Sequence, residues 1–240
     1  LPLPGGATVR NALLTFRFMV QKLRRDWGRI SVLAVLAALA IIIAVAMRAS
    51  DGGVTPEEGA EFLAWYGLSI ILPFGSLLVA SDAFGDLRDE RTLVYLWLRP
   101  MRAWSATAGA AGAALTVVIV LLVVPLIVAG LILDVPVADG ALLAAVAYTG
   151  VFLAFGLLLS RPLLVGLLVL LVWENVIGTL SAATARLTIR SYAASLVVSE
   201  GWDVGTPVGR SFAASLAVPL AVGVAGLLLA TWGWRRAEVA

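Results

Sequence analysis

An uninterrupted apolar stretch near the start of the chain decides the fold: ISVLAVLAALAIIIAVAM at residues 30–47. This stretch contains no charged residue and no proline. A helix rises about 1.5 Å per residue, so about 20 such residues cross the ~30 Å hydrocarbon core of a bilayer. A barrel strand would instead be short and would alternate in polarity. The stretch therefore predicts a membrane-spanning helix.

The rest of the chain repeats this pattern. Five more stretches are long and apolar enough to cross a membrane, at residues 64–80, 106–133, 141–159, 162–178 and 212–234. Of the 240 residues, 61% are hydrophobic and only 13% charged, whereas a soluble domain is about 25% charged. These values exclude a soluble enzyme, a disordered tail and a disulfide scaffold. We expect an all-α integral membrane protein with six transmembrane helices.

The basic residues predict the orientation of the spans. With both termini on one side of the membrane, that side holds 13 of the 17 basic residues: Arg10, Arg17, Lys22, Arg24, Arg25, Arg29, Arg88, Arg91, Arg99, Arg102, Arg161, Arg235 and Arg236. Segments flanking cytoplasmic membrane surfaces are enriched in Lys and Arg. We therefore expect a multi-pass protein of the cytoplasmic membrane with both termini in the cytoplasm. Residues 1–6 lack a basic segment before an apolar one, so we expect no cleavable signal peptide.

Residues 1–29 form a separate N-terminal region in this prediction, ahead of a transmembrane domain at residues 30–240. Residues 11–27 place apolar side chains on one arc of a helix and most of the charged ones elsewhere. This pattern is typical of an amphipathic helix in the membrane interface. Two interpretations stay open: a simple topology anchor, and an elbow helix that also contacts a cytoplasmic partner.

The inner loop at residues 82–104 combines dense charge with exposed apolar side chains. A cluster of mixed charge at residues 86–91 precedes Leu93, Leu96 and Trp97, and Pro100 then ends the segment. Apolar anchors rimmed by charge suit a protein-docking surface. A solvated loop with an interfacial tryptophan is the alternative.

This loop resembles the first cytoplasmic loop of the type-2 ABC export permeases. That family has an acidic and basic cluster, then Thr-Leu, a Leu-rich stretch, and Pro followed by Arg. The matching residues here are Arg88, Asp89, Glu90, Thr92, Leu93, Leu96, Leu98, Pro100 and Arg102. The six spans, the amphipathic start, the very short turn at residues 160–162 and the long last outer segment also agree with the family.

The resemblance implies a transport subunit without a nucleotide site of its own and without a cofactor. Two permease copies, as a homodimer or a related heterodimer, would each rest on a cytoplasmic ATPase subunit that binds ATP and Mg²⁺. Membrane lipid would be a further partner, and nucleic acid would not. The residues implied to couple the ATPase to the spans are Asp86, Arg88, Asp89, Glu90, Arg91, Thr92, Leu93, Leu96, Trp97, Arg99, Pro100, Arg102 and Arg161.

Glu174 is an ionisable residue inside the fifth predicted span, between Trp173 and Asn175. An ionisable group in hydrocarbon is costly and marks a functional candidate. One interpretation places these three residues on a substrate pathway. The other makes Glu174 a structural contact to a neighbouring helix, helped by Asn175. The sequence does not separate the two.

The segment at residues 179–211 is neither a clean span nor a polar loop. Its apolar residues surround Arg186 and Arg190, one helical turn apart. We expect short outer helices here between spans five and six. A surface helix that only anchors the outer leaflet is the alternative.

The chain contains no Cys and no His, and it has no phosphate-binding G-x-x-x-x-G-K-[ST] motif. These absences weigh against a membrane enzyme, because few catalytic groups remain. The function we expect is the membrane subunit of an ATP-driven exporter for a hydrophobic or amphipathic substrate, such as a drug, a lipid or a peptide. The alternative is a non-transporting assembly or sensor subunit on the same scaffold.

Overall fold

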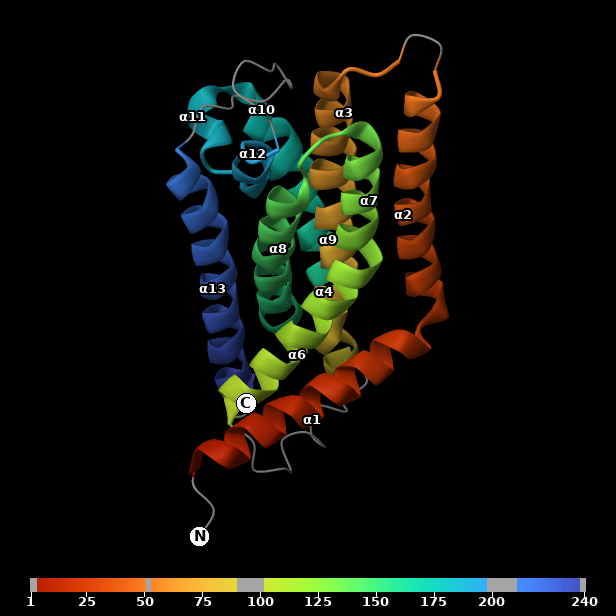
Figure 1. Ribbon diagram of the computed structural model, residues 1–240. Coiled ribbons are helices and arrows are strands. Elements are labelled where there is room, and N and C mark those ends of the chain that lie inside the picture. Colours follow the sequence, from red (N-terminus) through yellow and green to blue (C-terminus); the bar gives the residue numbers. More distant parts are fainter. Residues whose placement is uncertain (1–3, 51–52, 90–101, 198–210, 238–240) are drawn as a thin grey trace.

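Long helices stand side by side and one helix, α1, lies across one end of them (Figure 1). The computed structural model describes residues 4–50, 53–89, 102–197 and 211–237. No strand occurs in these ranges. The helices are α1 (Pro4–Arg25), α2 (Trp27–Arg48), α3 (Pro56–Phe62), η1 (Leu63–Ile71), α4 (Leu72–Asp89), α6 (Ala103–Val118), η2 (Ile119–Val123), α7 (Val124–Leu133), α8 (Ala138–Leu158), α9 (Pro162–Leu168), η3 (Val169–Ile177), α10 (Gly178–Leu180), α11 (Ala182–Ala185), α12 (Ile189–Ala194) and α13 (Phe212–Ala237).

Five helices are long and apolar enough to cross a membrane. They are Trp27–Arg48, Pro56–Ala83, Ala103–Leu133, Ala138–Leu158 and Phe212–Arg236. Four of them contain a predicted span in full, and Ala138–Leu158 contains all but the last residue of the span predicted at 141–159. The span predicted at residues 162–178 is not among these five helices. In its place lies a shorter apolar helix, Pro162–Ile177. The all-helical membrane fold is therefore confirmed for the described residues. Five of its helices, and not six, are long and apolar enough to cross a membrane.

The first helix starts earlier and ends sooner than the pattern at residues 11–27 predicts. It runs from Pro4 to Arg25, and Trp27 already belongs to α2. The break lies at Asp26, whose carboxylate accepts the backbone N–H of Arg29 at 3.3 Å and so caps α2. A side chain that satisfies a free N–H in this way favours the start of a new helix.

Two of the long helices and the shorter apolar helix Pro162–Ile177 contain a π-helical stretch: η1, η2 and η3 respectively. Pro73 and Pro125 follow η1 and η2 by two residues. Proline cannot donate to the helical ladder and its ring crowds the preceding turn, so a wider turn just before it relieves the conflict. No proline follows η3, which carries Glu174 instead.

Small residues hold the centre of the bundle together. α8 packs against both α4 and α13, and Gly150 of α8 meets Gly223 of α13. A Cβ built on Gly150 would lie 2.3 Å from the carbonyl oxygen of Gly223, and one on Gly226 would lie 2.4 Å from the Gly150 backbone. Because only hydrogen fits in such a gap, these helices approach backbone to backbone, as in other membrane helix pairs.

Candidate functional site

The elements that flank residues 90–101 converge at the end of the bundle where α1 lies (Figure 1). α4 leads into this segment and α6 leads out of it. α1 packs along α6, so closely that a Cβ on Gly109 would lie 2.5 Å from the carbonyl oxygen of Ala12. The end of α8 lies beside α4. The two backbones are so close that a Cβ built on Gly156 would lie 2.5 Å from the carbonyl oxygen of Ser81. The turn at residues 160–162 therefore reaches the same end.

Asp82 ties α4 to the other side of this assembly. Its side chain is buried, with 5% exposed, and Oδ2 lies 3.0 Å from the guanidinium of Arg29. Arg29 also pairs with Asp26 at 3.0 Å. Lys22 of α1 donates to the backbone carbonyl oxygen of Asp82 at 3.3 Å. Lys22 of α1 and Arg29 of α2 thus both contact Asp82 of α4, Lys22 at the backbone carbonyl oxygen and Arg29 at the carboxylate.

We call the combination of these contacts the inner clasp: Ala12 and Lys22 of α1, Arg29, Asp82 and Gly109. It holds α1 against the helix before residues 90–101 and against the helix after them. α1 is therefore in contact with both helices that flank residues 90–101.

The predicted coupling residues divide into three groups. The last turns of α4 contain Asp86, Arg88 and Asp89. Arg102 and Arg161 are exposed and directly precede α6 and α9. The others lie outside the described residues: Glu90, Arg91, Thr92, Leu93, Leu96, Trp97, Arg99 and Pro100.

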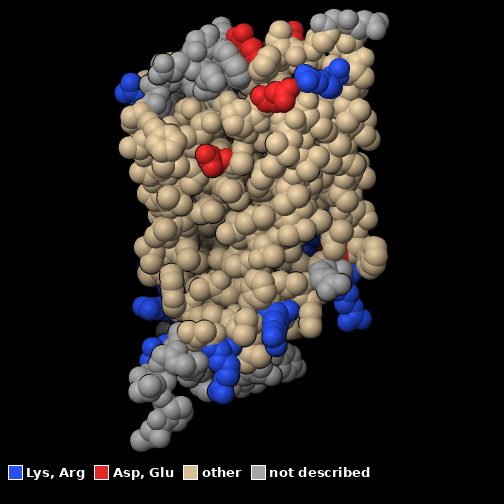
Figure 2. All heavy atoms as spheres, in the orientation of Figure 1, with Lys and Arg blue, Asp and Glu red and all other residues tan. Residues whose placement is uncertain are grey.

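Charge is distributed unevenly along the bundle. On the face drawn in Figure 2, Lys and Arg side chains gather at the α1 end, whereas most of the Asp and Glu side chains lie in the opposite half. The tan surface between them carries almost no charge on this face. An apolar belt with a basic end is what a membrane-embedded bundle presents to lipid and to one aqueous side.

The carboxylate of Glu174 caps a short helix at the other end of the bundle. Only 4% of Glu174 is exposed. Its Oε1 accepts the backbone N–H of Ile189 at 3.1 Å, and its Oε2 accepts that of Arg190 at 3.2 Å. These N–H groups open α12, which has no side-chain cap of its own from Thr188. A negative charge at this position satisfies free donors and complements the helix dipole.

The two neighbours of Glu174 bind the same segment. Trp173 donates its indole N–H to the carbonyl oxygen of Leu187 at 3.1 Å. Asn175 accepts from the guanidinium of Arg190 at 3.4 Å and donates to the carbonyl oxygen of Leu170 at 2.8 Å. We call this set, Trp173 to Asn175 with Leu187 to Arg190, the outer clasp. The structure thus places all three predicted pathway residues in contact with residues 187–190.

Sequence reasoning missed the partners in both clasps. From the sequence, Asp82 is only the first residue of the predicted inner loop, and Lys22 and Arg29 only add to the basic charge of the cytoplasmic side. The available signal was a lone acid at the end of an apolar span, which needs a basic partner. The sequence shows the spacing of Arg190 from Arg186, but the contact of Arg190 with Glu174, sixteen residues away, depends on how the chain turns back at α10 and α11.

One comparison with known proteins is informative. The model of a family described as ABC-2 family transporter protein matches residues 18–188. The match covers more than half of the chain and includes both clasps except Ala12 of the inner one and Ile189 and Arg190 of the outer one. No curated protein matches the sequence closely.

Proposed function

The chain belongs to the ABC-2 family of transporter proteins, and from that premise we propose that it is the membrane-spanning subunit of an ATP-driven exporter. As a multi-pass protein of this family it is a permease component, and such components typically have no nucleotide site of their own. The finer proposal concerns direction, partner and substrate. The part that concerns the partner is supported by the inner clasp, which fastens α1 to α4 and α6 on either side of the predicted coupling segment.

The proposed topology has six crossings with both termini in the cytoplasm of the cell. α9, η3 and α10 follow one another without a break from Pro162 to Leu180, which supports a fifth crossing somewhat longer than the apolar helix alone. The basic end with α1 would face the cytoplasm. α1 would then be an elbow helix at the inner membrane surface, and α10 to α12 would lie on the outer side.

A separate ATPase subunit would dock at residues 86–102 and at Arg161. Two supports for this proposal lie in the described residues: the last turns of α4, which contain Asp86, Arg88 and Asp89, lie at the α1 end, and Arg102 and Arg161 are exposed. ATP and Mg²⁺ would bind to the partner. A second permease copy, identical or related, would complete the transporter.

The substrate we propose is hydrophobic or amphipathic, because the bundle interior offers few charges. Trp173, Glu174 and Asn175 remain candidates for its pathway. Glu174 is buried against residues 189 and 190, so a substrate would meet its carboxylate only if α12 moved away from it.

Co-purification with the ATPase tests the docking proposal. Charge reversal at Arg88, Asp89, Glu90 and Arg91 together should abolish co-purification while thermal unfolding of the permease is unchanged. The matched control reverses Arg48 and Asp134, an exposed ion pair at 3.1 Å at the opposite end of the bundle, and should leave co-purification intact. Equal binding of the ATPase to the parent and to the fourfold variant would refute the docking surface.

Transport is tested in proteoliposomes that contain both subunits. ATP-dependent movement of a fluorescent amphipathic probe away from the α1 side would support export. A docked, active ATPase without movement of any probe would instead favour the assembly or sensor subunit.

A further inference from the structure

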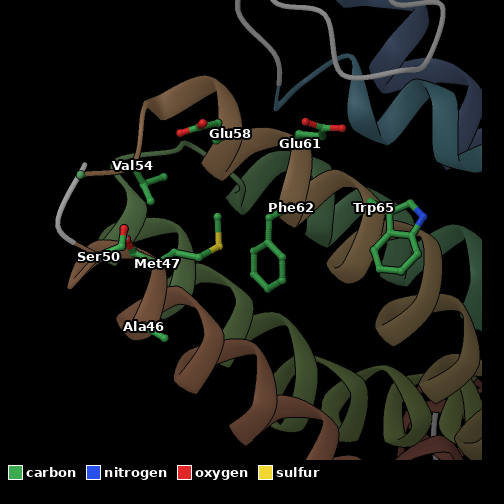
Figure 3. Close-up of a pocket in the computed structure, with 9 residues that line it drawn as sticks. Ala46, Met47, Ser50, Val54, Glu58, Glu61, Phe62 and Trp65 are labelled. Carbon is green, nitrogen blue, oxygen red and sulfur yellow. The ribbon is translucent and has the colours of Figure 1, made fainter.

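A pocket of about 670 Å³ opens at the end of the bundle opposite α1, between α2 and the helix formed by α3 and η1 (Figure 3). The lining residues come from the end of α2, from the connection after it, from α3 and from the first turn of η1: Ala46, Met47, Ser50, Gly53, Val54, Glu58, Glu61, Phe62 and Trp65. It belongs to neither clasp.

The floor of the pocket is apolar and aromatic. Met47, Phe62 and Trp65 project into the space between the two helices in Figure 3. Phe62 is held in place because it stacks on Tyr66 with ring centroids 5.4 Å apart. Trp65 keeps 57% of its surface exposed. A ring face that is fixed on one side and open on the other can receive an apolar or cationic group.

Two carboxylates stand at the rim, Glu58 and Glu61, one helical turn apart. Thr55 holds Glu58 in position, since its backbone N–H and its hydroxyl lie 2.9 and 3.0 Å from Oε2. This capping box is part of the start of α3. Glu61 is exposed and belongs to no ion pair within the described ranges.

No basic residue among those described lines this pocket. The nearest in sequence, Arg48, is engaged by Asp134 at 3.1 Å. Within the part of the chain that the structure describes, no lysine or arginine neutralises the two negative charges at the rim. An apolar floor below an uncompensated negative rim is complementary to a molecule that has an apolar body and one positive charge.

We propose that this pocket binds a lipophilic organic cation, with its charge between Glu58 and Glu61 and its apolar body on Phe62 and Trp65. The occupant is a freely diffusing molecule rather than a membrane lipid. The proposal does not depend on transport or on an ATPase, because it concerns binding to the permease chain alone.

The test measures binding of tetraphenylphosphonium to the purified full chain in neutral detergent micelles by titration calorimetry, with protein-free micelles as the blank. We expect saturable binding. Glu61→Gln should raise the Kd at least fivefold, and Trp65→Leu should raise it at least threefold. The neutral analogue triphenylphosphine oxide should bind at least tenfold more weakly than the cation.

Glu57→Gln is the matched control, because Glu57 lies on the same turn of α3 but does not line the pocket. It should leave the Kd unchanged. If Glu57→Gln and Glu61→Gln raised the Kd equally, the binding would depend on the general negative charge of α3 and not on a carboxylate in the pocket. That result would overturn the proposal. So would an unchanged Kd in Glu61→Gln.

Glu58→Gln also removes the capping charge of α3, so Glu61→Gln, which leaves the capping box intact, is the primary variant. Its thermal unfolding should match that of the parent, which separates lost binding from lost folding. Competition distinguishes the source of the cation. Displacement of the probe by phosphatidylethanolamine but not by phosphatidylglycerol would assign the pocket to a lipid headgroup and overturn the proposal.

Discussion

Glu174 and Arg190 meet through the backbone: Oε2 of Glu174 accepts the N–H of Arg190 at 3.2 Å, and Oε1 accepts the preceding N–H, that of Ile189. A charged residue that the sequence places inside a span thus caps the first turn of α12. The contact crosses from the π-helical η3 to the short helices at the end of the bundle. π-helical turns often occur at functional sites, and here the turn directs three successive side chains toward one segment.

Loss of the Glu174 carboxylate should destabilise the protein. Glu174→Ala leaves two N–H groups of α12 without an acceptor, and an unsatisfied buried donor costs about 1–3 kcal/mol. We expect the free energy of unfolding in mild detergent to fall by about 2 kcal/mol or more. Glu174→Gln should be milder, since the amide oxygen still accepts one N–H. Thermal unfolding measures both.

The exposed Glu57→Gln is the control for this prediction and should leave the unfolding temperature unchanged. If Glu174→Gln abolished transport while stability stayed at the parent value, the pathway interpretation would be favoured over the capping one. An unchanged stability in Glu174→Ala would contradict the cap.

The buried pair of Asp82 and Arg29 should be energetically coupled. A double-mutant cycle of Asp82→Asn and Arg29→Gln should give an interaction energy of about 1–3 kcal/mol, because Asp82 is desolvated and breaking a buried pair leaves a charge uncompensated. The measurement is chemical or thermal unfolding of the parent, the two single variants and the double variant.

A second cycle on Arg48 and Asp134 provides the comparison. Both side chains of this pair are more than half exposed, at 56% and 63%, and exposed pairs contribute about 0–1 kcal/mol. Equal coupling energies in the two cycles would mean that burial does not strengthen the inner clasp.

Two glycines on α6 should respond differently to the same change. A Cβ at Gly109 would lie 2.5 Å from the backbone of Ala12, so Gly109→Ala should push α1 away and cost about 1–3 kcal/mol of stability. At Gly112 the nearest atom would be Cδ2 of Phe16, at 3.5 Å. Gly112→Ala should therefore be neutral or stabilising by up to about 1 kcal/mol, since alanine favours a helix.

Thermal unfolding of the two variants checks the prediction, and ATPase co-purification shows whether α1 matters for docking. A Gly109→Ala protein as stable as the parent would show that α1 can move off α6 without cost.

The absence of cysteine allows a direct test of orientation. Single substitutions Glu57→Cys and Arg161→Cys introduce one thiol each, at opposite ends of the bundle. With intact cells and an impermeant maleimide, we expect labelling at position 57 alone. Position 161 should react only after the cells are lysed. Labelling of position 161 in intact cells would reverse the proposed topology.

The sequence by itself determined the membrane class, the helical fold and the approximate limits of the spans. Long apolar runs such as residues 30–47 have few stable structures in a bilayer other than a helix, because each backbone polar group must be satisfied within the segment. The positions of Asp26 and Thr55 could also have indicated where α2 and α3 start, since the capping interaction acts over three residues.

Only the tertiary structure decided which charged residues meet. Asp82 is separated from Lys22 by sixty residues, and Glu174 from Ile189 and Arg190 by fifteen and sixteen. A hydropathy pattern gives the length and the apolar face of each helix but not its rotation or its neighbours. Those depend on close packing at residues such as Gly109 and Gly150, where the absence of a side chain sets how near two backbones come.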